Sequence, residues 1–419
     1  MQKTFILLFC ISLVCCQTGK KPAESSSDRI STTIHLTEAI DKAGQVFLSE
    51  IADSISLIAL ETDDRSLLGN SLGFNFTDDY IFARNYCFNW DGTFTGEIGQ
   101  RGQGPCEEPG QTIGKVIFKD KHFYTVSTKF IQYDSLMQCT GKERTLYRLE
   151  SDGQRPVAGS TMLNISAVAN AKENIILYAY PDSVIFVDTA FTFISSWPVL
   201  YPTPHFNSTM GVGGTYQKRF TNFGNQTLVY NFFNDTIYYA DSDCLMPAWI
   251  VELSDKKRVP NVLLYRGDEL SHGAFVAWES GSLDHCELVR LTDNKVAVMA
   301  VYETSRYVFL VWSEMIQLAE LRNKQEPTPQ IAFFDKQTGK TKSTKENGFE
   351  DDLLDMDTYL PLWGACNDML IQSMWPHELH GYIDECNRSG RKVNPKLLDF
   401  AHKVLPDDNP VLIVAHLKK

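Results

Sequence analysis

The segment Gly99-Gln-Arg-Gly-Gln-Gly-Pro105 has the composition of a phosphate-binding loop. A Walker A loop needs Lys and Ser or Thr directly after its last glycine, and a dinucleotide-binding loop needs a helix there. Neither follows, because Pro105 comes next and a β-rich run begins at Lys115. The segment is therefore predicted to connect two pieces of sheet.

Two roles stay open for the residues in and near this connection. Glycine and proline at tight turns are structural, because glycine accepts a positive φ and proline fixes a negative one. Other side chains would bind a ligand if they faced an open channel. The predicted structural turn residues are Gly92, Gly102, Gly104 and Pro105. The candidate binding residues are Arg101, Gln103, Glu107 and, in a later loop, Trp363.

Two further motifs have catalytic spacing but lack the required context. Gly69-Asn-Ser-Leu-Gly73 has the spacing of a hydrolase nucleophile elbow, which needs a strand, a sharp turn and a helix, whereas the residues after it predict a hairpin. His377 and His380 are three residues apart, whereas zinc-binding HExxH helices space their histidines four apart. Trp375 and Pro376 predict a strand or turn there, so we assign no catalytic residue and no metal ligand.

An acidic segment leaves calcium open as the one cofactor to consider. It lacks the glycine and the terminal glutamate of an EF-hand loop, so a solvated acidic loop is the first expectation and a calcium site is the alternative. Its carboxylates are Asp351, Asp352, Asp355 and Asp357. Tryptophans near loops either pack in the core or stack on sugar rings, and these are Trp278, Trp363 and Trp375.

Composition restricts the class of partner. The 419 residues are 43% hydrophobic and 22% charged, which suits a large folded core rather than a disordered chain. The formal net charge of −13 argues against a nucleic-acid partner, because phosphate binding needs clustered Lys and Arg.

Residues 1–15 are predicted to be a lipoprotein signal peptide. Lys3 precedes an apolar run from Phe5 to Val14, which is too short to span a bilayer as a mature helix. Leu13-Val-Cys-Cys16 is similar to a bacterial lipobox, so we predict a diacylated Cys16, with an ordinary secretory signal as the alternative. Residues 16–35 are predicted to be a flexible tether. No acidic residue directly follows Cys16, which favours a periplasm-facing anchor over a surface-exposed one.

The cysteine count does not indicate a disulfide framework. Seven cysteines follow Cys16, an odd number, and none are in CxxC spacing. An exported protein can form disulfides, but we expect most of these side chains to be small buried hydrophobes. They are Cys87, Cys106, Cys139, Cys244, Cys286, Cys366 and Cys386.

Short β-rich runs dominate the chain from residue 55 onward, without long helical segments between them. They are rich in Val, Ile, Tyr and Phe and are bounded by turn residues. The runs are 55–60, 80–83, 115–118, 122–126, 174–180, 183–187, 226–230, 236–240, 295–302 and 330–334. This pattern predicts an all-β fold of antiparallel strands.

A degenerate repeat predicts six units. A strand end followed by Asp or Asn recurs at spacings of about 45 to 54 residues, with one longer interval, and periods of 40–50 residues with several strands each are typical of β-propellers. The six marks are Phe88-Asn89, Tyr133-Asp134, Val187-Asp188, Ala240-Asp241, Phe334-Asp335 and Ile383-Asp384. A pair of β-sandwiches is the alternative.

Three helices and a ring closure complete the prediction. Leu36 to Ala43 and Pro395 to Val404 are expected as short helices, the latter capped by Asn394, and Ser313 to Asn323 as an inserted amphipathic helix. Residues 55–60 and 410–417 are expected to pair and close the last blade, because closure removes free sheet edges.

The sequence resembles the six-bladed β-propeller lipoproteins of Bacteroidetes, most of which have no known function. The resemblance covers about residues 36–419 and is most specific in "IG-x-x-G-x-GP-x-E", present here from Ile98 to Glu107, with Cys106 where the family usually has Gly. It implies one six-bladed propeller of four-stranded antiparallel blades over residues 36–419. It implies no particular activity, since propellers have many functions.

We therefore expect a membrane-tethered, exported binding module without catalysis, whose ligand is a glycan, a peptide or a partner protein. The alternative is a hydrolase or lyase, metal-dependent and lactonase-like, with its site in the central channel. Ligands for such a metal would come from different blades, so sequence spacing does not reveal them. Three or more converging Asp, Glu, Asn or His side chains would favour the alternative.

Overall fold

The folded unit of the computed structural model comprises Thr32–Lys419. The structure describes residues 32–69, 73–108, 115–126, 129–145, 164–180, 183–198, 220–224, 226–230, 234–260, 287–314, 329–345, 348–356, 358–359 and 364–419. The predicted signal peptide, Cys16 and the tether up to residue 31 lie outside these ranges, as do Trp278 and Trp363.

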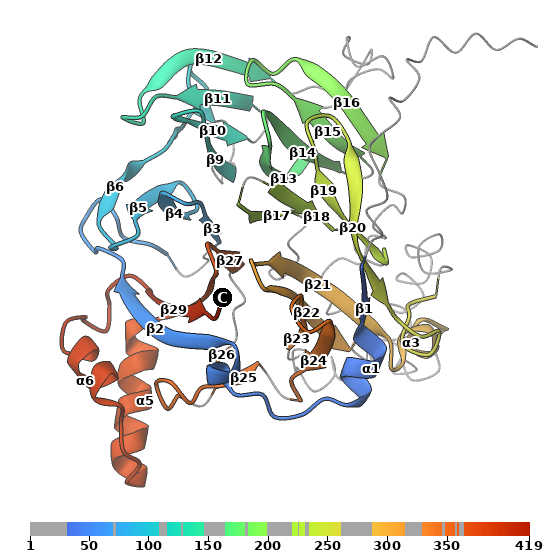
Figure 1. Cartoon of the computed structure of the whole chain (residues 1–419). Helices are drawn as coiled ribbons and strands as arrows, with labels where there is room; N and C mark the ends of the chain where they lie inside the picture. The colour runs from blue at the N-terminus through green and yellow to red at the C-terminus, as the bar shows by residue number, and fades with distance from the viewer. Residues whose placement is uncertain are drawn as a thin grey trace, which may run out of the picture. The chain divides into compact units, whose positions relative to one another are not determined.

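Six antiparallel sheets are arranged as the blades of a ring, which confirms the predicted fold (Figure 1). Blade 1 has β3 (Phe74–Phe76), β4 (Tyr80–Ala83), β5 (Tyr86–Asn89) and β6 (Phe94–Glu97). Blade 2 has β9 (Lys115–Lys119), β10 (His122–Val126), β11 (Lys129–Tyr133) and β12 (Cys139–Thr145). Blade 3 has β13 (Asn164–Ala171), β14 (Asn174–Tyr180), β15 (Ser183–Val187) and β16 (Phe193–Pro198).

The second half of the chain repeats this pattern. Blade 4 has β17 (Phe220–Phe223), β18 (Gln226–Val229), β19 (Thr236–Ala240) and β20 (Leu245–Glu252). Blade 5 has β21 (Val296–Glu303), β22 (Tyr307–Glu314), β23 (Gln330–Asp335) and β24 (Lys340–Ser343). Blade 6 has β27 (Gly364–Cys366), β28 (Met369–Met374), β29 (Val411–Leu417) and β2 (Ala52–Ala59). In each blade the first strand named lies nearest the ring axis (Figure 1).

The core lies between neighbouring blades, so the inner strands of blade 5 are buried on both faces. All eight residues of β21 are buried, and β22 is buried except at its last residue. Aromatic side chains join blade to blade: the Tyr80 ring of blade 1 lies 5.2 Å from Phe118 and 5.4 Å from Phe123 of blade 2, centroid to centroid. This packing explains why the strands are continuous apolar runs rather than alternating ones.

The two ends of the folded unit close the ring, as predicted. β2 pairs antiparallel with β29, with Ile55 opposite Ala415 and Ile58 opposite Leu412. Blade 6 therefore joins strands more than 350 residues apart in the sequence, with β29 paired on both sides and β2 as the outer strand of the blade.

One of the six repeat marks was wrong, although the blade count was right. Five marks lie at the ends of the third strands of blades 1 to 5. Ile383-Asp384 instead lies in the helix α5 (Pro376–Ser389), where Ile383 packs into the core. Blade 6 has no third strand at that point because β29, from the end of the chain, takes this position.

The folded unit begins four residues before the predicted end of the tether. β1 (Thr32–His35) pairs in parallel with β20, and Ile34 is completely buried. The chain continues through α1 (Leu36–Asp41), contacts blade 5 where Gly44 bridges Thr344, and passes η1 (Leu48–Glu50) before β2. Residues 32–59 thus run along the outer strands of blades 4, 5 and 6 (Figure 1).

The helix predictions were partly right. α1 and α6 (Pro395–Ala401) are present, and the Asn394 side chain caps α6 by accepting from Lys396 N at 3.0 Å. The predicted helix from residue 313 was wrong at its start, because Ser313 and Glu314 end β22; residues 315–323 lie outside the described ranges. Of the helices that the structure describes, none is long and apolar enough to cross a membrane.

Three short elements complete the fold. α3 (Glu287–Thr292) precedes blade 5, and β25 (Phe349–Glu350) pairs with β26 (Thr358–Tyr359) between blades 5 and 6. β7 (Gln100–Arg101) pairs in parallel with β8 (Glu107–Glu108) between blades 1 and 2. The glycine-rich segment therefore does connect two blades.

Candidate functional site

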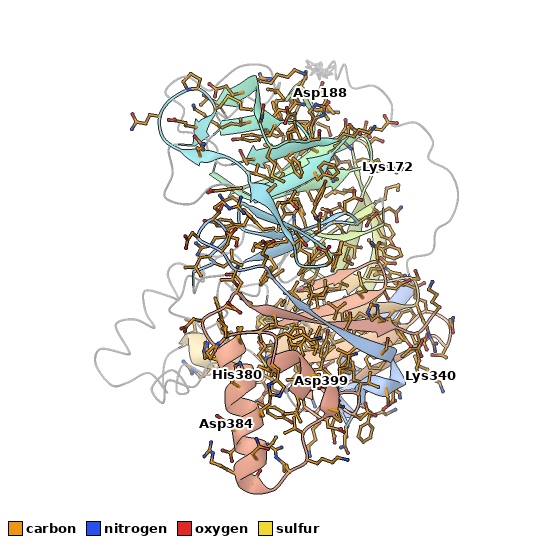
Figure 2. The ribbon with its side chains drawn as sticks, turned by 90° about the vertical axis from the view of Figure 1, so that its left-hand side faces the viewer. Lys172, Asp188, Lys340, His380, Asp384 and Asp399 are labelled. Atoms are coloured by element: carbon orange, nitrogen blue, oxygen red, sulfur yellow. A yellow bond between two sulfur atoms is a disulfide. The ribbon has the colours of Figure 1, made fainter. Side chains whose placement is uncertain are left out.

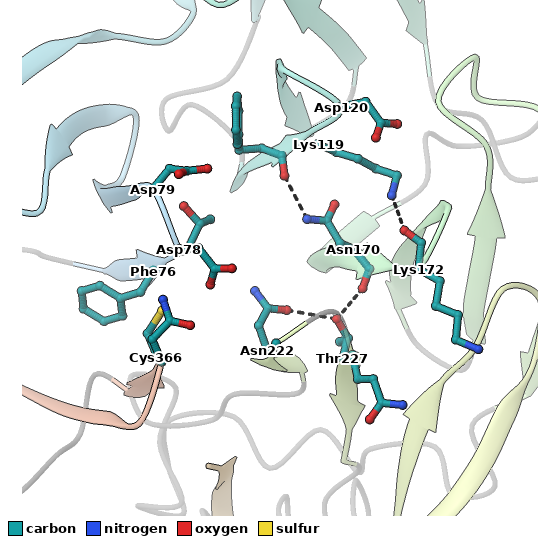
Figure 3. Close-up of a pocket in the computed structure, with 15 residues that line it drawn as sticks. Phe76, Asp78, Asp79, Lys119, Asp120, Asn170, Lys172, Asn222, Thr227 and Cys366 are labelled. Carbon is teal, nitrogen blue, oxygen red and sulfur yellow. Dashed lines mark hydrogen bonds between the residues drawn. The ribbon is translucent and has the colours of Figure 1, made fainter. Parts of the chain in front are cut away.

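A cavity of about 620 Å³ opens where the innermost strands turn into the second strands (Figure 3). Its described lining comes from five blades. The lining residues are Phe76, Thr77, Asp78, Asp79, Phe118, Lys119, Asp120, Asn170, Lys172, Asn222, Gly224, Gln226, Thr227, Cys366 and Asn367. Since each blade contributes the same hairpin, the fold itself gathers polar turn residues at this mouth of the ring.

The local sequence explains why polar residues occupy these turns. Asp120 and Lys121 both have positive φ, as do Asn367 and Asp368, and two successive positive φ values are typical of the tight turns that join antiparallel strands. Asn and Asp tolerate this conformation better than other non-glycine residues, and Gly224 tolerates it best. Turn chemistry therefore supplies the polar lining of the cavity.

Hydrogen bonds between blades hold the rim in place. Asn170 Nδ2 of blade 3 donates to Phe118 O of blade 2 at 2.9 Å, and Lys119 Nζ donates to Lys172 O in the opposite direction. Thr227 of blade 4 contacts Asn170 O through its hydroxyl group and lies 3.0 Å from Asn222 Oδ1. The rim is thus crosslinked across three neighbouring blades.

Both cationic side chains of the lining have protein partners. Lys119 is 8% exposed, and its burial lowers the pKa of its ammonium group. Lys172 Nζ lies 2.5 Å from Asp241 Oδ1 of blade 4, and this hydrogen bond holds the pKa of Asp241 below its usual value. Each ammonium group is therefore already engaged by an acceptor of the protein.

The carboxylates of the lining are in the opposite situation. Asp78, Asp79 and Asp120 are exposed at the cavity, and none forms an ion pair with a residue that the structure describes (Figure 3). Asn170 Oδ1 is buried and has no hydrogen-bond partner within the described part of the chain. The unpaired charged groups of the described lining are therefore carboxylates.

The cysteine in the lining is not poised as a nucleophile. Burial and, to a smaller extent, the charge of Asp78 raise the pKa of the Cys366 thiol to about 12. A thiol with this pKa is protonated near neutral pH and reacts slowly. Cys366 and Phe76 instead give the cavity an apolar side.

No metal centre is formed by the residues that the structure describes: no three His, Cys, Asp or Glu side chains are close enough together to hold an ion. His380 lies on helix α5 (Figure 2), where its Nε2 is 3.1 Å from Val404 O. His377 is exposed on the same helix. The prediction of a strand or turn at residues 376–377 was therefore wrong, because Pro376 begins a helix, a position that favours proline.

A family model for the "Domain of unknown function (DUF4934)" matches residues 31–416. The chain belongs to this family. Among solved structures, it is similar to a "Putative exported protein" from Bacteroides fragilis, with 17% identity and a TM-score of 0.62 over 93% of this chain and 99% of that one. At this identity the match supports the fold alone.

Other matches are more distant. A protein of unknown function from Bacteroides caccae has 10% identity and a TM-score of 0.34 over 66% of this chain and 84% of that one. BamB from Moraxella catarrhalis has 14% identity and a TM-score of 0.30 over 69% and 62%. No curated protein shows significant sequence similarity to the chain.

The glycine-rich loop from Ile98 to Glu107 lies at the opposite mouth of the ring from the cavity. Successive strands of a blade run in opposite directions. The first and third turns of blade 1 therefore lie at one end of the blade, and the second turn and the connection to blade 2 lie at the other end. Ile98 N accordingly donates to Asn85 O, in the second turn, at 2.8 Å. None of the loop's residues is among those that line the cavity.

Within that loop, the Glu107 side chain stabilises the turn. The Glu107 carboxylate accepts from Gly104 N at 2.8 Å, and a Cβ at Gly102 would lie 1.8 Å from Glu107 Oε2. Gln103 is exposed to solvent. The Arg101 side chain and Trp363 lie outside what the structure describes.

Cys106 stands where the resemblance expects glycine, and it has the backbone conformation that glycine favours, with φ at 65°. It forms a disulfide with Cys139 of β12, which joins the loop to blade 2. The expectation of buried free thiols was therefore wrong for this pair; it was right for Cys87, Cys366 and Cys386.

The acidic segment is only partly solvated. Asp351 is 3% exposed and accepts from the backbone N–H groups of Leu353 and Leu354, and burial raises its pKa. Asp352 is exposed and accepts from Ser49 N at 2.9 Å. The prediction of a fully solvated loop was wrong at Asp351, because this side chain caps its own turn. Asp357 lies outside the described residues.

The repeat pattern in the sequence did not predict the cavity, because it marks a different turn of each blade from the one that lines the cavity. The repeat marks lie after the third strands, whereas the lining follows the first. One signal was present: Thr77-Asp-Asp-Tyr80 and Thr304-Ser-Arg-Tyr307 share a Thr-x-x-Tyr spacing after an apolar run. Aligning the chain on that turn would have placed Asp78 and Asp79 at the ring axis.

Proposed function

We propose that this protein is an exported, lipid-anchored binding protein that holds a ligand in the cavity at the hairpin mouth and carries out no covalent chemistry. The observation that carries the proposal is the cavity itself: about 620 Å³, lined by side chains from five blades. Ligand sites in proteins typically have volumes of about 300–1,000 Å³.

The cavity suits binding because its rim is fixed before a ligand arrives. The inter-blade hydrogen bonds of Lys119, Asn170 and Thr227 join blades 2, 3 and 4. A fixed rim costs less conformational entropy on binding than a mobile loop does. The tight turns of the lining also resist movement, since their backbone conformations are restricted.

The membrane anchor belongs to the same proposal. Cys16 would be diacylated and would hold the propeller at a membrane, on the periplasm-facing side, where the ligand would be a glycan, a peptide or a segment of a partner protein. Replacing Cys16 with Ala should leave the protein in the soluble fraction after cell lysis. Unchanged membrane association and unchanged processing of Cys16→Ala would contradict the anchor.

Filling the cavity tests the binding proposal. Gln226 lines the cavity at the start of β18, so Gln226→Trp should block it. Gln337→Trp is the matched control, because Gln337 is exposed in a third-to-fourth-strand turn on the same side of the ring and does not line the cavity. Full-length protein in detergent would be titrated with panels of oligosaccharides and peptides, and its melting temperature followed.

We expect at least one ligand class to raise the melting temperature of the wild type and of Gln337→Trp by several degrees, and to leave Gln226→Trp unchanged. An equal response in Gln226→Trp would place the binding elsewhere and overturn the proposal. A panel without any response would also count against it.

A lactonase-like hydrolase or lyase is the second candidate. It would need a divalent cation held by oxygens from several blades, and Asp78, Asn222 and Asn367 do come from three different blades. A rise in melting temperature with calcium or zinc, lost in Asp78→Asn, would favour this candidate over the binding-only proposal.

A further inference from the structure

We infer that the ligand enters the cavity with a cationic group, and that it is a basic peptide segment whose lysine or arginine side chain meets Asp78 and Asp79. This inference rests on the proposed function, since it assigns the ligand class of the same site. It follows from an imbalance among the charged groups of the lining, whose ammonium groups are engaged and whose carboxylates have no ion partner among the described residues.

The cationic donors of the described lining are engaged by the protein, as are the donors of Asn170 and Thr227. Lys119 Nζ donates to Lys172 O, and Lys172 Nζ is paired with Asp241. Asn170 Nδ2 donates to Phe118 O, and the Thr227 hydroxyl group is bound between Asn170 and Asn222. An anionic ligand, such as a phosphate or a sulfated sugar, would find both ammonium groups already paired and would meet only the neutral amides of Asn222, Gln226 and Asn367.

The acceptors, by contrast, are open. The carboxylates of Asp78, Asp79 and Asp120 have no ion partner among the described residues, and Asn170 Oδ1 is buried without a hydrogen bond. A buried acceptor without a partner costs free energy until a donor reaches it. A ligand rich in N–H groups would supply those donors.

The excess of negative charge at the cavity favours a cationic ligand group over a neutral hydrogen-bond donor. The described lining and Asp241, which pairs with one of its lysines, together carry four carboxylates and two ammonium groups. The carboxylates are those of Asp78, Asp79, Asp120 and Asp241. Hydrogen bonds with one ionised partner are roughly twice as strong as neutral ones, and an ammonium or guanidinium group would have an ionised partner here. The formal net charge of −13 would also attract basic ligands from a distance.

The cavity also accommodates the rest of a basic side chain. Phe76 and Phe118 are in the lining next to the carboxylates, and the methylene groups of Lys or Arg pack well on such apolar surface. Asp78 and Asp79 lie on one turn, with Phe76 at its start, so an extended side chain could contact ring and carboxylate together (Figure 3).

Trilysine is the probe for this inference, and its fully Nε-acetylated form is the control for shape without charge. Binding to the full-length protein would be measured by isothermal titration at low and at physiological salt. Asp78→Asn/Asp79→Asn keeps the turn and removes both charges. Asp384→Asn, on the exposed face of α5, is the matched variant away from the cavity.

We expect trilysine to bind the wild type and Asp384→Asn alike, more weakly at higher salt, and to lose at least tenfold in affinity in Asp78→Asn/Asp79→Asn. Acetylated trilysine should bind at least tenfold more weakly than trilysine. Equal binding of both peptides, binding insensitive to the double substitution, or an Asp78-dependent response to calcium without a response to trilysine would overturn the inference.

The experiment separates the inference from the proposed function. If an oligosaccharide binds in a way that Gln226→Trp abolishes, while trilysine does not bind, the cavity is a ligand site and the cationic assignment is wrong. If no probe binds in a way that depends on Gln226, both fail.

Discussion

Two hairpins with the same backbone geometry differ in what they do for the protein. In blade 1, Thr77 N donates to Tyr80 O at 2.9 Å, and Tyr80 N donates to Thr77 Oγ1 at 3.0 Å. In blade 5, Thr304 and Tyr307 repeat both bonds at 2.9 and 3.0 Å. We call these the Thr77 hairpin and the Thr304 hairpin.

The charged side chains in and next to the Thr304 hairpin are paired with neighbouring side chains. Glu303 is 3% exposed and accepts from Tyr239 Oη at 2.8 Å, from Trp249 Nε1 at 3.2 Å and from Lys336 Nζ at 2.6 Å. Arg306 pairs with Asp335 at 3.0 Å. The charged partners Lys336 and Asp335 thus come from blade 5 itself, and blade 4 adds two neutral donors.

The carboxylates of the Thr77 hairpin have no such partners in the described structure and face the cavity. The backbone of the turn is therefore the same in both hairpins, and the partners of its charged groups differ. Where the charged groups are paired, the hairpin belongs to the framework; where they have no ion partner among the described residues, the hairpin stays available to a ligand. Each prediction below tests one side of this difference.

Removing the buried carboxylate should have the largest effect. Glu303→Ala leaves Tyr239, Trp249 and Lys336 without their shared acceptor, so we expect the free energy of unfolding to fall by about 3–5 kcal/mol. Denaturant unfolding would measure it. Asp78→Ala, in the Thr77 hairpin, should change it by less than about 0.5 kcal/mol. Similar losses in both variants would break the comparison.

Blade 1 also has a structural turn, at Gly92. Its φ is 91°, and a Cβ there would lie 2.0 Å from Ala59 O of β2. Gly92→Ala should destabilise the protein by about 1–3 kcal/mol through strain and overlap together. Gly141→Ala is the control for strain alone, since φ is 79° there and no atom lies within 4 Å. Equal unfolding midpoints for the two variants would exclude the contact with β2 as a cause.

A reciprocal exchange at the third position of the two hairpins sharpens the comparison. Arg306→Asp places a carboxylate next to Asp335 and should cost about 1 kcal/mol of stability, with unchanged binding of trilysine. Asp79→Arg should leave stability unchanged and abolish trilysine binding. Thermal unfolding and titration of both variants would measure this. Loss of binding in Arg306→Asp with full stability would contradict it.

The smallest effect is a pH dependence at the cavity rim. Lys172 lowers the pKa of Asp241 in the folded state, so this pair stabilises the protein above the unfolded pKa of Asp241 and loses its contribution as pH falls through the folded value. Lys172→Met should therefore be less stable than the wild type by under about 1 kcal/mol near pH 6, because both side chains are partly exposed. The difference should disappear in acid; a constant difference from pH 6 to pH 2 would contradict the assignment.

The fold was predictable because it rests on local signals. Runs such as 80–83, 122–126 and 236–240 became strands with the same bounds, since β-branched and aromatic residues between turn residues form strands wherever they pack. The closure of 55–60 on 410–417 was predictable because a ring needs it. Helix α5 was not, because Ile383-Asp384 imitates a strand end.

The candidate site was not predictable in the same way. Asp78, Lys119, Asn170 and Asn222 are close only because four blades meet at one axis, and no spacing in the sequence records that meeting. The ion pairs at the site were not predictable from the sequence either. Lys172 pairs with Asp241, 69 residues further on, whereas Asp78 has no such partner in the described structure. Partners across blades decide which charges are free.

One pair of measurements on one variant tests the central claim most directly: that the Thr77 hairpin carries ligand binding rather than stability. Asp78→Asn/Asp79→Asn would be titrated with trilysine and unfolded in denaturant from the same preparation. We predict at least a tenfold loss of affinity, about 1.4 kcal/mol, with a change in the free energy of unfolding below about 0.5 kcal/mol. A marked loss of stability with unchanged affinity would show that these carboxylates belong to the framework, and would contradict the account.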